Sequence, residues 1–207
     1  MNYTQSWISY PDVAPLLKAL GVKPNEEGNP YTLPAICDKS IASTINPNGI
    51  MMDSLSIATH LDKLYPSPPL FPSGDSSLAL VETVNKTMGG MAPALRQIVP
   101  PKSFGKPLSD MHPTDEKTLQ ELWDLIESQM STILNMLKSR PGPFFEGASA
   151  SYADIVLVSS LAAFHNDDRE LWERMMALGE GELKTLWDVC LPWITGQGEE
   201  KEWPVDE

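Results

Sequence analysis

Hydrophobic residues recur every three or four positions in two parts of the chain, which predicts two amphipathic helices. The first is expected over 53–65. The second is expected to begin at a cap on Thr114, with acidic residues in its first turn, and to end at Lys138 before Pro141-Gly142. Its apolar stripe consists of Leu119, Leu122, Trp123, Ile126, Met130, Ile133, Leu134 and Leu137.

Shorter patterns surround these two helices. The segments 6–9 and 31–37 are strand-like, and the segment 12–20 has the pattern of a short helix. The other expected helices all lie in the second half of the chain or just before it: 78–98 with an interruption at Gly89-Gly90, one introduced by 151–154, 171–178 and 183–193.

A proline-rich segment separates two regions of different character. Residues 65–74 contain four prolines and end in a glycine, a composition that neither a helix nor a central strand accommodates. Short mixed segments precede it, and only helical patterns follow it. The sequence therefore predicts an α/β unit over 1–74 followed by an all-α unit over 75–207.

The net charge of the chain argues against nucleic acids and anionic membranes as partners. Fifteen Lys and Arg against 28 Asp and Glu give a net charge of −13, and such a surface repels nucleic-acid phosphates and anionic membranes. The first residues lack the basic start and apolar stretch of a signal peptide, and no apolar run approaches the ~20 residues of a membrane span. We therefore expect a cytoplasmic protein with neither a nucleic-acid nor a membrane partner.

The candidate metal ligands and thiols are scattered. Cys37 and Cys190 are far apart in apolar surroundings, which does not indicate a disulfide framework. His60, His112 and His165 have no second ligand at the spacing of a metal site. No metal is expected.

Leu33-Pro34 lies inside an otherwise strand-like run. Because proline has no N–H to donate to a sheet, it marks the edge or the beginning of a strand, or a cis turn. A cis bond would turn the backbone of Leu33 outward and leave its N–H and C=O free for an extended peptide ligand. An ordinary proline at a strand edge explains the same residues equally well.

Asp53-Ser54 opens the first predicted helix. Both are good N-cap residues, so a purely structural cap is one interpretation. The other is an anion site, because a helix N-terminus with a hydroxyl and free N–H groups attracts a carboxylate. The strand that contains Pro34 and the helix that begins at Asp53-Ser54 would together hold a small peptide at two points. We call this expected site the clamp, and its residues are Leu33, Pro34, Asp53 and Ser54.

These segments resemble the glutathione-binding half of glutathione transferases, and most closely the fungal etherase-related subgroup. The resemblance rests on 31–36 (YTLPAI), 53–62 (DSLSIATHLD) and 65–66 (YP). It implies a glutathione-transferase-like fold, glutathione as co-substrate, an apolar electrophilic small molecule as substrate and a homodimer as candidate assembly. By resemblance, the main chain of Leu33 would pair with the cysteinyl backbone of glutathione, while Asp53 and Ser54 would hold its γ-glutamyl end.

The motif SYAD at 151–154 resembles the family's folding motif. Ser151 can cap the free N–H groups of the following helix, while the Asp154 side chain reaches back to the chain that enters it. We expect Ser151 and Asp154 to form a structural capping box with no catalytic role.

The N-terminus departs from the family's pattern. Glutathione transferases begin with a strand and a helix that carry the Ser, Tyr or Cys that stabilises the glutathione thiolate. Here only 33 residues precede Pro34, and the first strand-like segment is 6–9. The resemblance therefore implies a thioredoxin-like unit that lacks its first strand and helix, and no residue takes the activating role. The segment between Asp38 and Asp53 is also longer than in the family.

The reactive partner is expected to be apolar and conjugated. The sequence offers Met88, Met91, Phe104 and Met111 near Gly89-Gly90 as an adaptable apolar wall, although ordinary core packing is the better explanation of these residues. The resemblance implies a glutathione-dependent transferase or isomerase, plausible for trans-to-cis olefin isomerisation in fungal polyketide secondary metabolism by reversible thiolate addition. The alternative is a non-catalytic binding or regulatory module.

Overall fold

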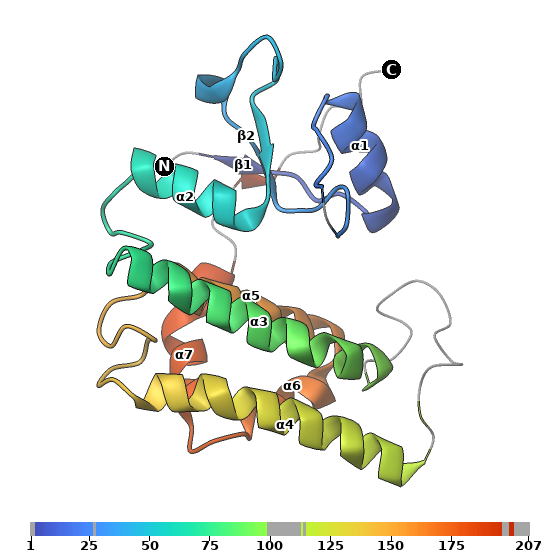
Figure 1. Ribbon diagram of the computed structural model, residues 1–207, viewed down its shortest axis with the longest axis vertical. Coiled ribbons are helices and arrows are strands. Elements are labelled where there is room, and N and C mark those ends of the chain that lie inside the picture. The colour runs from blue at the N-terminus through green and yellow to red at the C-terminus, as the bar shows by residue number, and fades with distance from the viewer. Residues whose placement is uncertain (1–2, 27, 99–112, 114, 196–198, 201–207) are drawn as a thin grey trace. The chain divides into compact units, whose positions relative to one another are not determined.

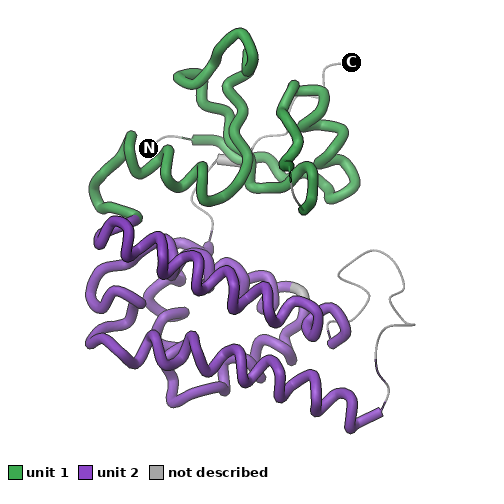
Figure 2. Tube along the Cα trace, viewed as in Figure 1, with its two compact units in different colours: residues 1–70, 197–207 green, residues 71–196 purple. Residues whose placement is uncertain are grey.

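The structure is a computed structural model that describes residues 3–26, 28–98, 113, 115–195 and 199–200. It divides into two compact units, Met1–Leu70 with Gln197–Glu207 and Phe71–Gly196 (Figure 2). The division falls inside the proline-rich segment, four residues before the boundary expected at residue 74.

In its described residues unit 1 contains two small sheets and two α-helices (Figure 1). In one sheet β1 pairs with β4 in parallel, and in the other β2 pairs with β3 antiparallel. The elements of unit 1 are β1 (Thr4–Gln5), η1 (Tyr10–Asp12), α1 (Val13–Ala19), β2 (Ala35–Cys37), η2 (Lys39–Ile41), β3 (Ile50–Met52), α2 (Ser54–Leu64) and β4 (Glu199–Glu200).

The strands are shorter than the sequence pattern predicts. The first strand lies at Thr4–Gln5, ahead of the predicted 6–9, and β2 covers only the last three residues of 31–37. Pro34 explains the second difference, because a residue without an N–H cannot extend the ladder with β3. The prediction was wrong about strand length for this reason.

The core of unit 1 is small and joins α1 to the β2–β3 sheet. Val13 and Leu17 on α1 and Ile50 on β3 are buried. The partly buried residues packed against them are Ile8, Leu20, Val22, Tyr31, Ala35 and Met52. Tyr31 and Ala35 flank the Leu33-Pro34 segment, so this core supports both ends of it.

The regular elements in the described part of unit 2 are all helices, in agreement with the predicted helical patterns, and two isolated β-bridges lie in the loop before α5. Figure 1 shows α3 and α4 side by side, and α5 contacts α3, α6 and α7. None of the described helices is both long and apolar enough to cross a bilayer. The helices are α3 (Asp75–Ile98), α4 (Glu116–Lys138), α5 (Tyr152–Asp167), α6 (Arg169–Met176) and α7 (Glu182–Ile194).

The helix α3 continues through Gly89-Gly90, so the predicted interruption was wrong. A side chain at Gly90 would place its Cβ 3.0 Å from the amide oxygen of Gln129 on α4, whereas nothing lies within 4 Å of a Cβ at Gly89. Gly90 therefore leaves room for the end of the Gln129 side chain, and the helix continues through both glycines.

The helix α4 begins one residue later than a cap at Thr114 would give. Asp115 is the N-cap, and its carboxylate accepts a hydrogen bond from the Thr118 N–H at 2.8 Å. This hydrogen bond is the main reason why the pKa of Asp115 is lowered. Thr114 itself lies outside the described residues.

A capping box opens α5, the helix at the centre of unit 2. Asp154 is fully buried, and its carboxylate accepts hydrogen bonds from the N–H of Ser151 (2.7 Å), the Ser151 hydroxyl (2.8 Å) and the N–H of Phe145 (2.9 Å). Burial raises the pKa of Asp154, while these hydrogen bonds act in the opposite direction. The carboxylate thus ties the loop at Phe145 to the start of α5.

We predict that Asp154→Ala destabilises the protein by about 2–4 kcal/mol, because it leaves buried N–H groups without an acceptor. Ser151→Ala, which removes the hydroxyl and leaves the two N–H donors to the Asp154 carboxylate, should cost about 1 kcal/mol. Urea unfolding measures both, with Asp124→Ala on the exposed face of α4 as the control. A loss below about 0.5 kcal/mol for Asp154→Ala would contradict this role.

Candidate functional site

The register of the β2–β3 hairpin brings the two halves of the expected clamp together. Ala35 pairs with Met52, so the preceding residue Pro34 and the following residue Asp53 lie at the same end of the hairpin. The Leu33–Pro34 bond is cis, and Leu33 is 46% exposed. The backbone of Leu33 and the start of α2 are thus neighbours in space although 20 residues separate them in the chain.

Asp53 forms the turn between β3 and α2. Its φ of 74° lies in the left-handed region, which few residues other than glycine adopt and which Asp tolerates better than most. Its carboxylate accepts hydrogen bonds from the Leu55 N–H (3.1 Å) and the Ser56 hydroxyl (2.9 Å). Asp53 is therefore the N-cap of α2, and its exposed carboxylate oxygens can accept further hydrogen bonds.

Ser54 is the first residue of α2 and is exposed. Its hydroxyl makes no hydrogen bond with any residue in the described ranges, because Asp53 takes the capping role. The sequence could not separate these roles, since both residue types cap helices. The exposed hydroxyl and the positive end of the helix dipole are the two features that the expected anion site requires.

Lys18 adds a positive charge that the sequence pattern did not single out. It lies on α1 with its ammonium 5.6 Å from the centre of the Tyr31 ring, two residues before Leu33. The only local signal was a basic residue in the last turn of a short helix, a common feature of helix C-termini.

The chemistry of this end of unit 1 suits a small zwitterionic peptide. The Leu33 backbone can pair with an extended peptide, the Asp53 carboxylate can accept from an ammonium group, and the start of α2 can receive a carboxylate. In the described ranges no three His, Cys, Asp or Glu side chains gather as metal ligands would.

The four candidate substrate residues do not form one described surface. Met91 is fully buried in the core of unit 2, which agrees with ordinary core packing, and Met88 is partly buried on the same helix. Phe104 and Met111 lie outside the described residues.

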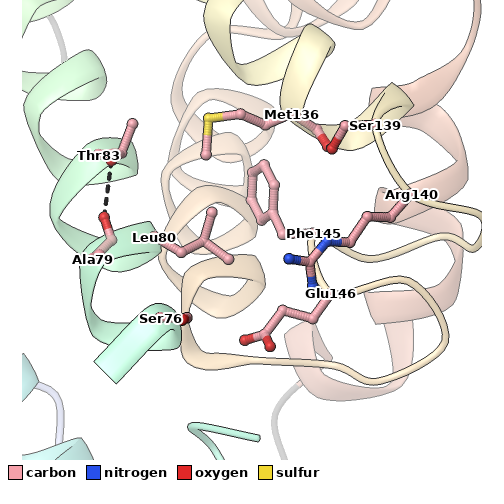
Figure 3. Close-up of a pocket in the computed structure, with 9 residues that line it drawn as sticks. All are labelled: Ser76, Ala79, Leu80, Thr83, Met136, Ser139, Arg140, Phe145 and Glu146. Atoms are coloured by element: carbon pink, nitrogen blue, oxygen red, sulfur yellow. Dashed lines mark hydrogen bonds between the residues drawn. The ribbon is translucent and has the colours of Figure 1, made fainter. Parts of the chain in front are cut away.

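Unit 2 has an open hollow of about 260 Å³ beside α3 and α4. In Figure 3, Leu80, Met136 and Phe145 point toward one another, with Arg140 and Glu146 at the rim. Glu146 is already engaged, since it accepts hydrogen bonds from the hydroxyls of Ser73 and Ser77. The hollow contains none of the residues of the expected clamp.

The two cysteines differ in reactivity. Cys37 is exposed at the end of β2, with its sulfur 3.3 Å from the carbonyl oxygen of Asn48. Cys190 is fully buried, and burial, together with the nearby charge of Asp154, raises its pKa to about 12. Cys190 is therefore a core residue without thiolate chemistry.

Comparison with known proteins identifies similar sequences. The family model of the glutathione S-transferase C-terminal domain matches residues 100–193. The chain is 43% identical over 230 residues to the glutathione S-transferase-like protein ustS of Aspergillus flavus, and the match covers 99% of this chain and 83% of that protein.

Solved structures show the same fold. A glutathione S-transferase of Ceriporiopsis subvermispora, crystallised in complex with glutathione, has a TM-score of 0.69 and 25% identity, and the match covers 91% of this chain and 82% of that one. The glutathione transferase GSTFuA3 from Phanerochaete chrysosporium has a TM-score of 0.68 and 21% identity, covering 92% and 83%. These similarities confirm the predicted fold class, a thioredoxin-like unit followed by a helical one.

We predict that an aromatic disulfide reagent, which releases a coloured thiol on reaction, rapidly modifies one cysteine per native chain. Cys37→Ser should remove this reaction, and Cys190→Ser should leave it unchanged, because only the Cys37 thiol is exposed to the reagent. Unfolding in urea should expose the second thiol. Two fast thiols in the native protein would contradict the burial of Cys190.

Proposed function

The chain belongs to the glutathione S-transferase family. From this premise we propose that it binds glutathione at one end of the β2–β3 hairpin, where Leu33, Pro34, Asp53 and Ser54 lie. The register of β2 and β3 carries this proposal, because it sets an exposed peptide edge beside the start of α2. Further support comes from the similar structure of C. subvermispora, which was solved in complex with glutathione.

Each end of glutathione has a chemical complement in unit 1. The γ-glutamyl end carries an ammonium and a carboxylate, which suit the Asp53 carboxylate and the Ser54 end of α2. The cysteinyl backbone would pair with Leu33. Lys18 is the cation proposed to attract the remaining carboxylate at the glycine end, since it is held against Tyr31.

The reaction proposed is reversible addition of the glutathione thiolate to an apolar olefin that is conjugated to a carbonyl group. The sulfur forms a bond to the β-carbon, and the alkene electrons move to the carbonyl oxygen as an enolate. Rotation about the former double bond follows, and collapse of the enolate expels the thiolate and leaves the cis isomer. Glutathione is regenerated, so no other co-reactant is consumed. This sequence needs no strong acid.

The proposed setting is secondary metabolism in a fungal cytoplasm, with a polyketide-derived olefin as substrate. The sequence resemblance that supports it extends to the glutathione transferase of the pseurotin pathway, PsoE. The similar protein ustS also comes from a fungus. Stable conjugation of glutathione to an electrophile uses the same first step and ends before elimination.

A non-catalytic glutathione-binding module is the second candidate. It is favoured by the surroundings of the Ser9 and Tyr10 hydroxyls, two groups that could otherwise stabilise the glutathione thiolate. The Ser9 hydroxyl already donates to Asp12, and Tyr10 is 85% exposed, so neither is held in a site that would stabilise a thiolate. Binding of glutathione without turnover of a conjugated enone would support the module, and turnover would support the enzyme.

We predict that Ser54→Ala weakens glutathione binding about 10- to 150-fold, the loss of one charge-assisted hydrogen bond of ~1.5–3 kcal/mol. Because Asp53 rather than Ser54 caps α2, thermal stability should change by less than about 0.5 kcal/mol. Isothermal titration calorimetry and thermal unfolding measure the two quantities.

Ser128→Ala, at an exposed serine of α4, is the matched control and should bind glutathione as the unaltered protein does. Unchanged affinity in Ser54→Ala would remove the hydroxyl from the proposed clamp. A large loss of stability would mean that Ser54 has a capping role after all.

We predict that glutathione-dependent turnover of a conjugated enone, corrected for the uncatalysed rate, still rises as the pH passes 8. A free thiol with a pKa near ~8.5 is only a few per cent thiolate at neutral pH, and no activating side chain has been assigned in this chain. The pH–rate profile measures this directly. A plateau reached below pH 7 would reveal an activating group and contradict the proposed mechanism.

A further inference from the structure

Asp38 and His60 join the far end of β2 to the middle of α2. The Nε2 atom of His60 lies 2.7 Å from Oδ2 of Asp38, and the two side chains are 16% and 24% exposed. A carboxylate only accepts hydrogen bonds, so Nε2 must carry the hydrogen in either charge state of the imidazole. The hydrogen bond therefore does not depend on protonation of His60.

Asp38 is itself fixed by the hairpin. Its second carboxylate oxygen accepts from the Ser40 N–H at 2.8 Å, and its own N–H donates to the carbonyl of Gly49 at 2.8 Å. Gly49 has a φ of 63°, and a Cβ there would lie 2.2 Å from the Asp38 carbonyl oxygen. The pKa of Asp38 is lowered to about 2, first by the His60 hydrogen bond and then by that of Ser40. Asp38 is thus a rigid, ionised acceptor.

The position of this hydrogen bond matters for the clamp. The antiparallel hairpin has Ala35 and Met52 at the end where the clamp lies, and Cys37 and Ile50 at the opposite end. Asp38 follows Cys37, and α2 leads from Ser54 toward His60 in its second turn. The helix is therefore attached to the hairpin twice, at its start through Asp53 and farther along through His60.

We propose that the Asp38–His60 hydrogen bond is a positioning contact that sets the direction of α2 and so keeps its N-terminus beside the Leu33 backbone. The assignment of glutathione as the ligand at this N-terminus rests on the function proposed above. Asp38, at the end of β2, gives the hairpin a second point of attachment for α2.

Three variants test this role. His60→Leu removes the donor, His60→Gln restores an N–H donor of similar reach, and Leu64→Ala at the exposed end of the same helix is the control. Hydrogen exchange of the backbone amides of 53–59, read by mass spectrometry, reports on α2 without any ligand. Calorimetry gives the dissociation constant of glutathione, and thermal unfolding confirms that each variant is folded.

We expect His60→Leu to accelerate exchange over 53–59 and to weaken glutathione binding about tenfold, within the range usual for coupling between separate contacts. His60→Gln should restore both, and Leu64→Ala should change neither. Normal exchange and affinity in folded His60→Leu, or no rescue by His60→Gln, would overturn the proposal.

Two further outcomes remain decisive. If His60→Leu does not fold, Asp38→Asn weakens the same hydrogen bond from the other partner while keeping an oxygen for Ser40, and it should show the same two effects. If the unaltered protein does not bind glutathione, the proposed function fails, and the exchange measurement alone decides whether His60 positions α2.

Discussion

The antiparallel pairing of Ala35 with Met52 is the constraint on which the proposed site depends. It places a peptide edge that Pro34 prevents from joining the ladder next to the point where the chain turns into α2. A two-residue change in register would separate the Leu33 backbone from the helix start, and the dipole of α2 would then face a different segment. Ile50, which is buried, and Met52, which is partly buried, pack with the core residues of α1 and hold this face of β3 inward.

Division of labour between Asp53 and Ser54 explains how one helix start can be both stable and open to a ligand. Asp53 adopts a positive φ and satisfies the Leu55 N–H, and its hydrogen bond from Ser56 holds the turn in place. Ser54 therefore does not cap the helix, and its hydroxyl is exposed to a ligand. The backbone cost of the left-handed conformation, on the order of 1–3 kcal/mol, is of the kind that proteins concentrate at binding sites.

Patterns within one helix could be predicted from the sequence, and contacts between distant segments could not. The stripe of α4 and the capping box of Ser151 and Asp154 are local, so spacing alone located them. Strand lengths were missed because they depend on ladder partners. Asp38 and His60 are 22 positions apart, and Lys18 contacts Tyr31 only once the chain has folded. Neither contact produces a periodic pattern in the sequence.

The most direct test of a glutathione site at the hairpin end is an amide-resolved NMR titration of the ¹⁵N-labelled protein with glutathione. We expect the largest shift changes at the amides of Leu33, Ser54 and Leu55, saturating together. Changes confined to the hollow around Leu80 and Arg140 in unit 2, or no saturable changes at all, would contradict the proposed site.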